Sequence, residues 1–351
     1  MKVFEFKLGN FTISNESKTF VIAELSANHN QDISIARKTI EFAAKAGADA
    51  IKLQTYTPDT ITLDSRREPF RIKGGTIWDG NYLYDLYQKA YTPWDWHEEL
   101  FSLANSLGLE AFSSPFDHTA VEFLETLNVP AYKIASFEIT DIPLIELVAS
   151  KMKPIIISTG IARFEDISAA LEACERVGNS QIILLKCTST YPAPLAELNL
   201  RMITEMKDTF KVWTGFSDHS KGNAAPFAAT ALGAKVIEKH LILDKEIGGP
   251  DSEFSQDSVG FELMVKGIRE IEEAMGSKSY ELTKGSEVSR KHARSIFVCA
   301  NAREDDVVNL SNVRSVRPND GLPPIHLKQV IGMRFSRDVQ FGEPLKWSML
   351  K

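Results

Sequence analysis

The chain has 351 residues and a mass of 39.2 kDa, which excludes a single small module and suits two domains or one large domain with an appendage. Hydrophobic residues make up 43% and charged residues 25% of the chain, a composition that excludes a disordered or collagen-like protein. The formal net charge of -7 and the pI near 5.6 give no basic footprint for nucleic acid, so a few local cations must hold any anionic ligand.

The amino terminus and the cysteines predict a soluble cytoplasmic protein with reduced thiols. Lys7 interrupts the position where a secretory signal needs an apolar core, and charges or glycines break every later apolar run before it reaches membrane-spanning length. Cys174, Cys187 and Cys299 cannot all pair with one another, and none lies in a CxxC motif. We therefore expect neither a disulfide framework nor a cysteine-based zinc site.

The first segment with a strand pattern, residues 2–19, alternates around Leu8-Gly9-Asn10 and predicts a β-hairpin that covers one end of the following domain. After it, short apolar runs rich in Val, Ile and Phe alternate with longer segments of helical period. The predicted strands are 20–26, 49–55, 109–115, 131–136, 154–160, 181–188, 211–218 and 234–241. The predicted helices are 33–47, 93–108, 118–128, 142–151, 164–178, 195–208, 222–233 and 259–276.

Eight strand-helix pairs before about residue 276 predict a (β/α)8 TIM barrel. An open doubly wound sheet would rarely need eight units, and it should carry a glycine fingerprint where this chain has AELSANHNQD. Beyond the barrel the pattern changes to short strands and proline-glycine turns such as VRPNDGL. We therefore divide the chain into a barrel domain with its hairpin, residues 1–283, and a linker with a small domain, residues 284–351.

A long insertion, residues 56–91, separates the second predicted strand from its helix. Barrel enzymes build their active sites from such loops, so the insertion is a candidate substrate loop, with a merely decorative insertion as the alternative. Its aromatic residues, and those just after it, could stack on a sugar or pack against the barrel. These residues are Trp78, Tyr82, Tyr84, Tyr87, Tyr91, Trp94 and Trp96.

Polar side chains end every one of the eight predicted strands, at the end where TIM barrels place their catalytic groups. Structural packing alone cannot account for so many polar side chains at strand ends, because burying charge without partners is costly. Lys52 and Lys133 lie inside apolar strands, so we expect their ammonium groups to face the barrel mouth, with outward snorkelling as the alternative. Together with five serines they predict a site for a phosphate or a carboxylate. The serines are Ser114, Ser136, Ser158, Ser189 and Ser217.

Two histidines predict a divalent metal site. His219 and His240 close the seventh and eighth predicted strands, which are neighbours in a closed barrel, and Glu24, Glu238 and Asp251 are expected nearby. Only two protein nitrogens leave positions open for substrate and water, which favours catalytic Mn²⁺ or Mg²⁺ over structural zinc. The remaining histidines outside these motifs are assigned structural roles. They are His97, His118, His292 and His326.

A series of motifs resembles the sialic acid synthase family along nearly the whole chain. They are IAELSANHNQD (22–32), IKLQT (51–55), SSPFD (113–117), YKIASFEIT (132–140), ISTG (157–160), CTSTYPAP (187–194), GFSDHS (215–220), VIEKHL (236–241) and GGPDSEFS (248–255). RSIFVCA and VRPNDGL then resemble the antifreeze-like (SAF) module at the carboxyl terminus of that family. Within the family, residues 74–97 are most similar to the pseudaminic acid synthases, whose sugar is 6-deoxy and diacetamido.

The resemblance implies a transferase that condenses phosphoenolpyruvate with the open-chain aldehyde of 2,4-diacetamido-2,4,6-trideoxy-L-altrose, giving pseudaminic acid and phosphate. An N-acetylneuraminic or legionaminic acid synthase on the same scaffold is the alternative. The resemblance also implies a divalent metal, Mn²⁺ before Mg²⁺ or Co²⁺, and a homodimer in which the SAF domain caps the partner's barrel. The residues alone leave open a metal-dependent sugar isomerase and a non-catalytic carbohydrate-binding protein.

The same resemblance implies a role for each candidate site residue. His219 and His240 match the metal ligands, and Glu24 and Asp251 match the carboxylates that hold the metal-bound water, one of which activates it. The residues that match the enolpyruvate carboxylate region are Lys52, Ser114 and Lys133. Those that match the phosphate region are Ser136, Ser158, Ser189 and Ser217, with Ser189 standing where some members have an amide. Those that match sugar contacts are Gln54, Tyr191, Asp251 and Arg317.

Overall fold

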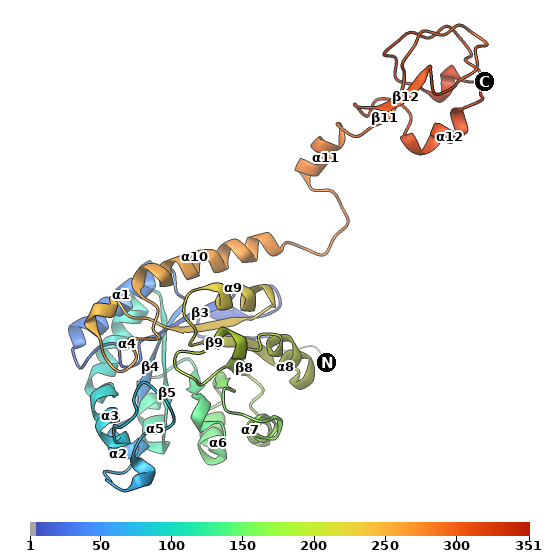
Figure 1. The fold of residues 1–351 in the computed structure, drawn as a ribbon. Coiled ribbons are helices and arrows are strands. Elements are labelled where there is room, and N and C mark those ends of the chain that lie inside the picture. The colour runs from blue at the N-terminus through green and yellow to red at the C-terminus, as the bar shows by residue number, and fades with distance from the viewer. Residues whose placement is uncertain (1–4) are drawn as a thin grey trace. The chain divides into compact units, whose positions relative to one another are not determined.

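A computed structural model describes residues 5–351 of the chain. The chain divides into two compact units, the first ending at Gly276 and the second spanning Ser277–Lys351. Each unit has its own cluster of buried apolar side chains. Figure 1 colours the two units in sequence order.

The first unit is built on eight parallel strands that close into a barrel in the order β10-β3-β4-β5-β6-β7-β8-β9, which confirms the predicted TIM barrel (Figure 1). The strands are β3 Phe20–Glu24, β4 Ala50–Thr55, β5 Glu110–Pro115, β6 Tyr132–Ile134, β7 Ile155–Ser158, β8 Ile182–Cys187, β9 Trp213–Asp218 and β10 Val236–His240. Nearly every strand residue is buried, as expected for a parallel sheet covered by helices on its outer side and filled by side chains on its inner side.

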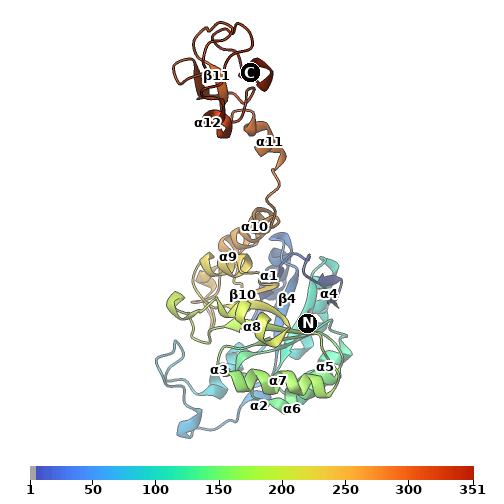
Figure 2. The same cartoon turned by 90° about the vertical axis from the view of Figure 1, so that its right-hand side faces the viewer.

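The helices that surround the barrel begin where the sequence supplies a capping side chain. Carboxylates of Asp32, Asp117, Asp141 and Asp257 accept backbone N–H groups at the starts of four helices, satisfying donors that have no partner inside the helix. The eight helices are α1 Ile33–Lys45, α4 His97–Ser106, α5 His118–Thr126, α6 Ile142–Ser150, α7 Phe164–Arg176, α8 Met202–Phe210, α9 Ala224–Ala231 and α10 Ser258–Met275. Figure 2 shows several of them around the strands.

The predicted hairpin is present at the amino end of the strands, although positions 2–4 of the predicted segment lie outside the described residues. β1 Phe6–Leu8 pairs antiparallel with β2 Phe11–Ile13, and Gly9 makes the turn with a φ of +58°. The Asn10 backbone N–H donates to Oε1 of Glu110, the first residue of β5, at 2.7 Å. A side chain at Gly9 would collide with the same carboxylate. The hairpin therefore closes the end of the barrel opposite the one where catalytic groups are expected.

The insertion between β4 and α4 has its own local structure. It contains helices α2 Pro58–Ile61 and α3 Leu83–Ala90 and short 3-10 turns η1 Glu68–Phe70 and η2 Trp94–Trp96. Trp78 Nε1 donates to the Pro250 carbonyl at 2.9 Å, which ties the insertion to the loop after β10. The other 3-10 turns of this unit are η3 Ser136–Glu138, η4 Leu195–Glu197 and η5 Lys245–Ile247.

The second unit is a small domain around an antiparallel pair, β11 Ser295–Val298 and β12 Val313–Val316. Its remaining elements are α11 Lys284–Arg290, η6 Pro324–His326, α12 Leu327–Val330 and η7 Trp347–Met349. Its core is formed by side chains that are almost fully buried: Ile296, Val298, Val308, Val313, Val330, Phe335, Val339, Leu345 and Met349. In the described part of the chain no helix is long and apolar enough to cross a membrane.

Candidate active site

A cavity of about 440 Å³ opens at the carboxyl ends of the barrel strands. The strands supply its polar floor, and the insertion supplies much of an apolar wall. The predicted site residues that line it are Lys52, Gln54, Ser114, Lys133, Ser136, Ser158, Tyr191, Ser217, His219, His240 and Asp251. Glu24 and Ser189 do not line the cavity, but each contacts a residue that does: Glu24 pairs with Lys52, and Ser189 donates a hydrogen bond to Ser136.

Lys52 is held inside the barrel by carboxylates, so the alternative of an outward, snorkelling lysine is excluded for this residue. Its ammonium forms an ion pair with Glu24 Oε2, lies 3.9 Å from Glu238 Oε2 and donates to Ser114 Oγ at 3.3 Å. Burial alone would lower the pKa of Lys52, but Glu238 and Glu24 outweigh it and raise the pKa. Lys52 is therefore a charged group whose charge is already compensated.

The two carboxyls beside Lys52 have pKa values shifted in opposite directions. Burial raises the pKa of Glu24 to about 7 despite the opposing effect of Lys52, and the neighbouring Glu238 adds to the rise. Burial also acts to raise the pKa of Glu238, but Lys52 and Lys133 outweigh it and the pKa falls below its ordinary value. Two nearby carboxyls with separated pKa values are the arrangement that acid-base chemistry requires.

Lys133 is the less compensated of the two cations. Its ammonium donates to Ser158 Oγ at 2.7 Å and to the Ile134 carbonyl at 2.8 Å, and it forms no ion pair with any carboxylate of the described residues. Its side chain is buried and lines the cavity, so it too does not snorkel outward. A bound anion would supply the charge partner that Lys133 lacks.

Hydroxyl groups beside Lys133 form a second part of the anion region. Ser189 Oγ donates to Ser136 Oγ at 2.8 Å, and Ser136 Oγ accepts the Ile161 N–H at 3.1 Å. Gly160 makes this approach possible, because a Cβ at that position would lie 2.2 Å from Ser189 Oγ and 2.7 Å from Ser136 Oγ. The glycine of the ISTG motif thus keeps room for the two serines.

His219 and His240 lie side by side, with ring centroids 5.2 Å apart. His219 Nδ1 is 3.2 Å from the Thr188 carbonyl, whereas His240 Nδ1 has no hydrogen-bond partner among residues 5–351 although it is buried. Burial and the nearby His219 lower the pKa of His240 well below its ordinary value, so its imidazole is neutral and can bind a cation. Within the described residues no cluster of three or more His, Cys, Asp or Glu could hold a metal ion. The arrangement fits a metal held by two imidazoles, with its other positions open.

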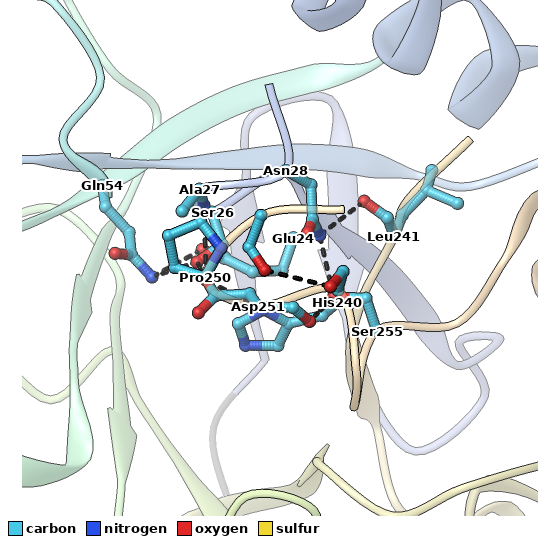
Figure 3. A network of polar contacts seen from close by, with 12 residues as sticks. Glu24, Ser26, Ala27, Asn28, Gln54, His240, Leu241, Pro250, Asp251 and Ser255 are labelled. Atoms are coloured by element: carbon cyan, nitrogen blue, oxygen red, sulfur yellow. Dashed lines mark hydrogen bonds and ion pairs between the residues drawn. The ribbon is translucent and has the colours of Figure 1, made fainter. Parts of the chain in front are cut away.

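Asp251 is fixed beside His240 by a network that Figure 3 shows. Its Oδ2 accepts from the Ser26 hydroxyl and from the Ala27 N–H at 3.3 Å, and lies 4.0 Å from His240 Nδ1. Its carbonyl accepts from the Ser255 hydroxyl at 2.6 Å. Burial raises the pKa of Asp251.

Gln54 and Asn28 connect this network to the strands (Figure 3). Gln54 Nε2 donates to Glu24 Oε1 and to Ser26 Oγ, both at 3.0 Å. Asn28 Nδ2 donates to Ser255 Oγ at 2.8 Å and to the carbonyl of Leu241, the residue after β10, at 3.0 Å. The loops after β3 and β10 are thereby held together around Asp251.

Some aromatic residues in and just after the insertion line the cavity, and others pack against the barrel. Trp78 and Tyr87 line the cavity, and Trp78 contacts Tyr191 with ring centroids 5.5 Å apart. Trp94 stacks on Phe123, and Trp96 contacts His29 edge to face, so both pack against the barrel. The apolar side chains that the insertion places along the cavity are Ile61, Ile72, Trp78, Leu83, Leu86 and Ala90, and the insertion also contributes Tyr56, Thr76 and Tyr87.

Among the cavity residues without a sequence-based prediction are the acid Glu138 and the thiol Cys187. Glu138 lies at the end of η3, with Oε2 buried and without a hydrogen-bond partner in the described chain, and burial raises its pKa to about 7. It follows the predicted strand end by two residues, so a wider search for acids after each strand would have found it. Cys187 ends β8, and its Sγ lies 3.7 Å from His219 Nδ1. No local pattern marked this thiol, because its partner follows it by 32 positions.

Arg317 belongs to the second unit, where the turn that carries it is held by Ser295. Ser295 Oγ donates to the Pro318 carbonyl at 2.7 Å and accepts the Gly321 N–H at 2.9 Å. The Arg317 side chain is exposed and has no hydrogen-bond or ion-pair partner in the part of the chain that the structure describes. It is therefore free to bind an acceptor outside its own unit.

Models of two known protein families match this chain. The model of the NeuB family matches residues 39–280, and the model of the SAF domain matches residues 306–351. The two matches correspond to the barrel and to the carboxyl-terminal domain.

The matched relatives extend over nearly the full length. The chain is 45% identical to the pseudaminic acid synthase of Campylobacter jejuni subsp. jejuni serotype O:23/36 (strain 81-176), covering 97% of this chain and 99% of that protein. It is 46% identical to the pseudaminic acid synthase of Helicobacter pylori (strain ATCC 700392 / 26695), covering 93% and 96%. The crystal structure of an N-acetylneuraminic acid synthetase from Leptospira borgpetersenii serovar Hardjo-bovis, in complex with citrate, matches with a TM-score of 0.73 and 29% identity, covering 82% and 95%.

Proposed function

Because this chain belongs to the NeuB family, the sialic acid synthase family that its motifs resemble, we propose that it is a pseudaminic acid synthase. The proposed reaction joins C3 of phosphoenolpyruvate to the aldehyde carbon of 2,4-diacetamido-2,4,6-trideoxy-L-altrose. Water adds at C2 of the former enol, and phosphate leaves with cleavage of its C–O bond. The products are pseudaminic acid and inorganic phosphate.

The observation that best supports this proposal is that a single cavity brings together three features. They are the anion region formed by Lys133 and the serine hydroxyls, the imidazoles of His219 and His240, and the apolar wall of the insertion. Lys133 and the serine hydroxyls suit the phosphate and carboxylate of phosphoenolpyruvate. A sugar isomerase would need the metal ligands and an acid-base pair but not this anion region. A non-catalytic carbohydrate-binding protein would need neither the metal ligands nor the anion region.

His219 and His240 are the residues proposed to hold a divalent metal, with Mn²⁺ before Mg²⁺ or Co²⁺. When bound, the ion supplies Lewis-acid polarisation of the sugar aldehyde. The neutral imidazole of His240, with its unpartnered Nδ1 in the described chain, is suited to that role. Asp251, 4.0 Å from that nitrogen, is positioned to hold water or a sugar hydroxyl beside it.

The chain's own residues are proposed to orient phosphoenolpyruvate and to stabilise its charge. Lys52, Ser114 and Lys133 would hold the carboxylate, and the phosphate would be held by Ser136, Ser158, Ser189 and Ser217. These donors are fixed by hydrogen bonds before substrate arrives, so they need little reorganisation as the charge on the leaving phosphate grows. Gln54, Tyr191 and Arg317 are proposed to contact the sugar.

Either Glu24 or Asp251 is proposed to activate the water that adds to C2, and a role for Glu24 predicts a specific pH dependence. The Glu24 pKa of about 7 means that the carboxylate form needed by a base is lost as the pH falls below 7. We expect kcat/KM to rise through an apparent pKa near 7 and then to level off. Glu24→Gln should reduce kcat by about 10²- to 10⁴-fold and remove this acidic limb. A limb that persists in Glu24→Gln, and disappears in Asp251→Asn, would assign the base to Asp251.

The direct test of the proposed reaction is release of phosphate from phosphoenolpyruvate. We expect release to depend on both phosphoenolpyruvate and the trideoxy sugar, and the sugar product to gain the mass of a three-carbon keto acid. Conversion of the sugar that proceeds equally well without phosphoenolpyruvate would instead indicate an isomerase. Binding of the sugar without turnover in the presence of Mn²⁺ and phosphoenolpyruvate would indicate a binding protein.

The 6-deoxy sugar is preferred in this proposal because of the apolar wall. Ile61, Ile72 and Leu86 offer no hydrogen-bond partner to a 6-hydroxyl, but they can cover a methyl group. The alternative of an N-acetylneuraminic acid synthase would have to place a 6-hydroxyl against this wall, where these three side chains offer it no partner.

We further propose that the protein forms a homodimer. The SAF domain would cap the barrel of the partner subunit and bring Arg317 to the sugar, where its planar guanidinium could bind an acetamido carbonyl. We also propose a cytoplasmic location, because the substrate phosphoenolpyruvate is a cytoplasmic metabolite.

A further inference from the structure

A fully buried ion pair lies on the outer side of the barrel beside the two histidines. Lys239 Nζ pairs with Asp218 Oδ2, and the two side chains are 1% and 0% exposed. Lys239 on β10 and Asp218 on β9 are register partners in adjacent parallel strands. Because alternate side chains of a strand point to opposite faces, and His219 and His240 line the cavity, this pair faces the helix layer.

The pair borders both histidines along the chain. Asp218 directly precedes His219, and Lys239 directly precedes His240. Lys239 Nζ also donates to the carbonyl of Ser220 at 2.8 Å. The Lys239 ammonium therefore binds Asp218 and Ser220, the residues on both sides of His219. Lys239 itself directly precedes His240 in the chain.

The acidic partner fixes the same short loop. Asp218 Oδ1 accepts the Ser220 N–H at 2.8 Å and the Ser220 hydroxyl at 2.7 Å. On the inner side of the barrel, Ser217 Oγ donates to Glu238 Oε1 at 2.9 Å. Strands β9 and β10 are thus tied on both faces at the point where the histidines emerge.

We propose that Asp218 and Lys239 are positioning residues that set the separation and direction of the two imidazoles, and thereby the affinity of the site for a divalent metal. The inference rests on the proposed metal site. Neither side chain touches substrate or metal; each acts through the backbone of its neighbouring histidine. Groups that orient metal ligands from outside typically change metal affinity by about 10- to 100-fold when they are replaced.

A merely structural ion pair is the alternative, and a second pair in the same barrel provides the comparison. Arg269 Nη2 on α10 lies 2.8 Å from Oδ2 of Asp49, the residue just before β4, at the amino end of the barrel. Asp49 also accepts the Val21 N–H at 2.8 Å. Loss of either pair should lower thermal stability, but only the first should change metal binding.

The test measures Mn²⁺ affinity of the full-length protein by electron paramagnetic resonance, together with the visible spectrum of its Co²⁺ form. Lys239→Met should weaken Mn²⁺ binding about 10- to 100-fold and alter the Co²⁺ bands. Because this change leaves Asp218 buried without its partner, the double variant Asp218→Asn/Lys239→Met, which removes both charges, should fold more readily and show the same loss. The control Asp49→Asn/Arg269→Met should bind both ions as the wild type does.

Equal Mn²⁺ affinity and an unchanged Co²⁺ spectrum in the folded double variant would overturn the inference while leaving the metal site intact. Equal losses of affinity in the control would also overturn it, because the effect would then follow general destabilisation. If the wild-type protein binds no Mn²⁺, and His240→Ala changes nothing, the proposed metal site itself is wrong, and the inference fails with it.

Discussion

Exhaustive removal of divalent metal should abolish product formation, and Mn²⁺, Co²⁺ or Mg²⁺ should restore it. The expected loss is about three orders of magnitude or more, since Lewis-acid stabilisation contributes several kcal/mol and each 1.36 kcal/mol is tenfold in rate. His219→Ala and His240→Ala should show losses of similar size that added metal does not restore. Each would leave a single imidazole where the structure pairs two with centroids 5.2 Å apart.

Two controls separate the metal effect from a loss of folding. The far-ultraviolet circular dichroism of the demetallated wild type should match that of the loaded protein, because the barrel core does not depend on the histidines. His326→Ala, in the small domain and half-buried on η6, should retain wild-type activity. Full activity in an exhaustively demetallated sample would contradict the proposed role of the metal.

A mixture of two inactive variants should regain activity if Arg317 serves the partner's barrel. Arg317→Ala alone is expected to be nearly inactive, because its guanidinium would provide a charged hydrogen bond to the sugar, and His240→Ala alone lacks a metal ligand. A hybrid dimer has one site with an intact barrel and an intact Arg317 from the other subunit. After full exchange at equal amounts, about one quarter of wild-type activity should return, because half of the dimers are hybrids with one working site of two.

The matched control for this experiment uses Arg314, an exposed arginine on β12 of the same domain. Arg314→Ala should be active by itself, so any gain on mixing can be assigned to Arg317. Subunit exchange is checked with differently tagged chains. If the hybrid forms and stays inactive, Arg317 either acts on its own barrel or has no part in the site.

The barrel was predictable from sequence because each of its elements carries its own signal. Eight apolar runs alternate with helical segments, and the count alone selects the closed barrel. One boundary that failed was the helix expected at 195–208, which is split into η4 and α8. Asn199 between them has a φ of +47°, a left-handed conformation that ends a helix and that asparagine tolerates better than most residues.

The part of the candidate site that lies at strand ends was predictable, because the carboxyl ends of the strands converge in a barrel. Lys52, Lys133 and the histidine pair all face one cavity, as the position of each on its strand indicated. The pairing of Lys52 with Glu24 was not predicted, because it depends on the register of β3 against β4. Glu138 was missed because it lies on the turn after β6 rather than on the strand.

The proposed function is tested by comparing kcat/KM for two sugars with phosphoenolpyruvate and Mn²⁺ at saturation. We expect a strong preference for 2,4-diacetamido-2,4,6-trideoxy-L-altrose over N-acetylmannosamine. An apolar wall favours a methyl over a hydroxyl, and a single such group contributes about 10- to 200-fold. The sugar's other differences should enlarge the preference. Equal or higher kcat/KM with N-acetylmannosamine would contradict the proposed function and make the protein an N-acetylneuraminic acid synthase.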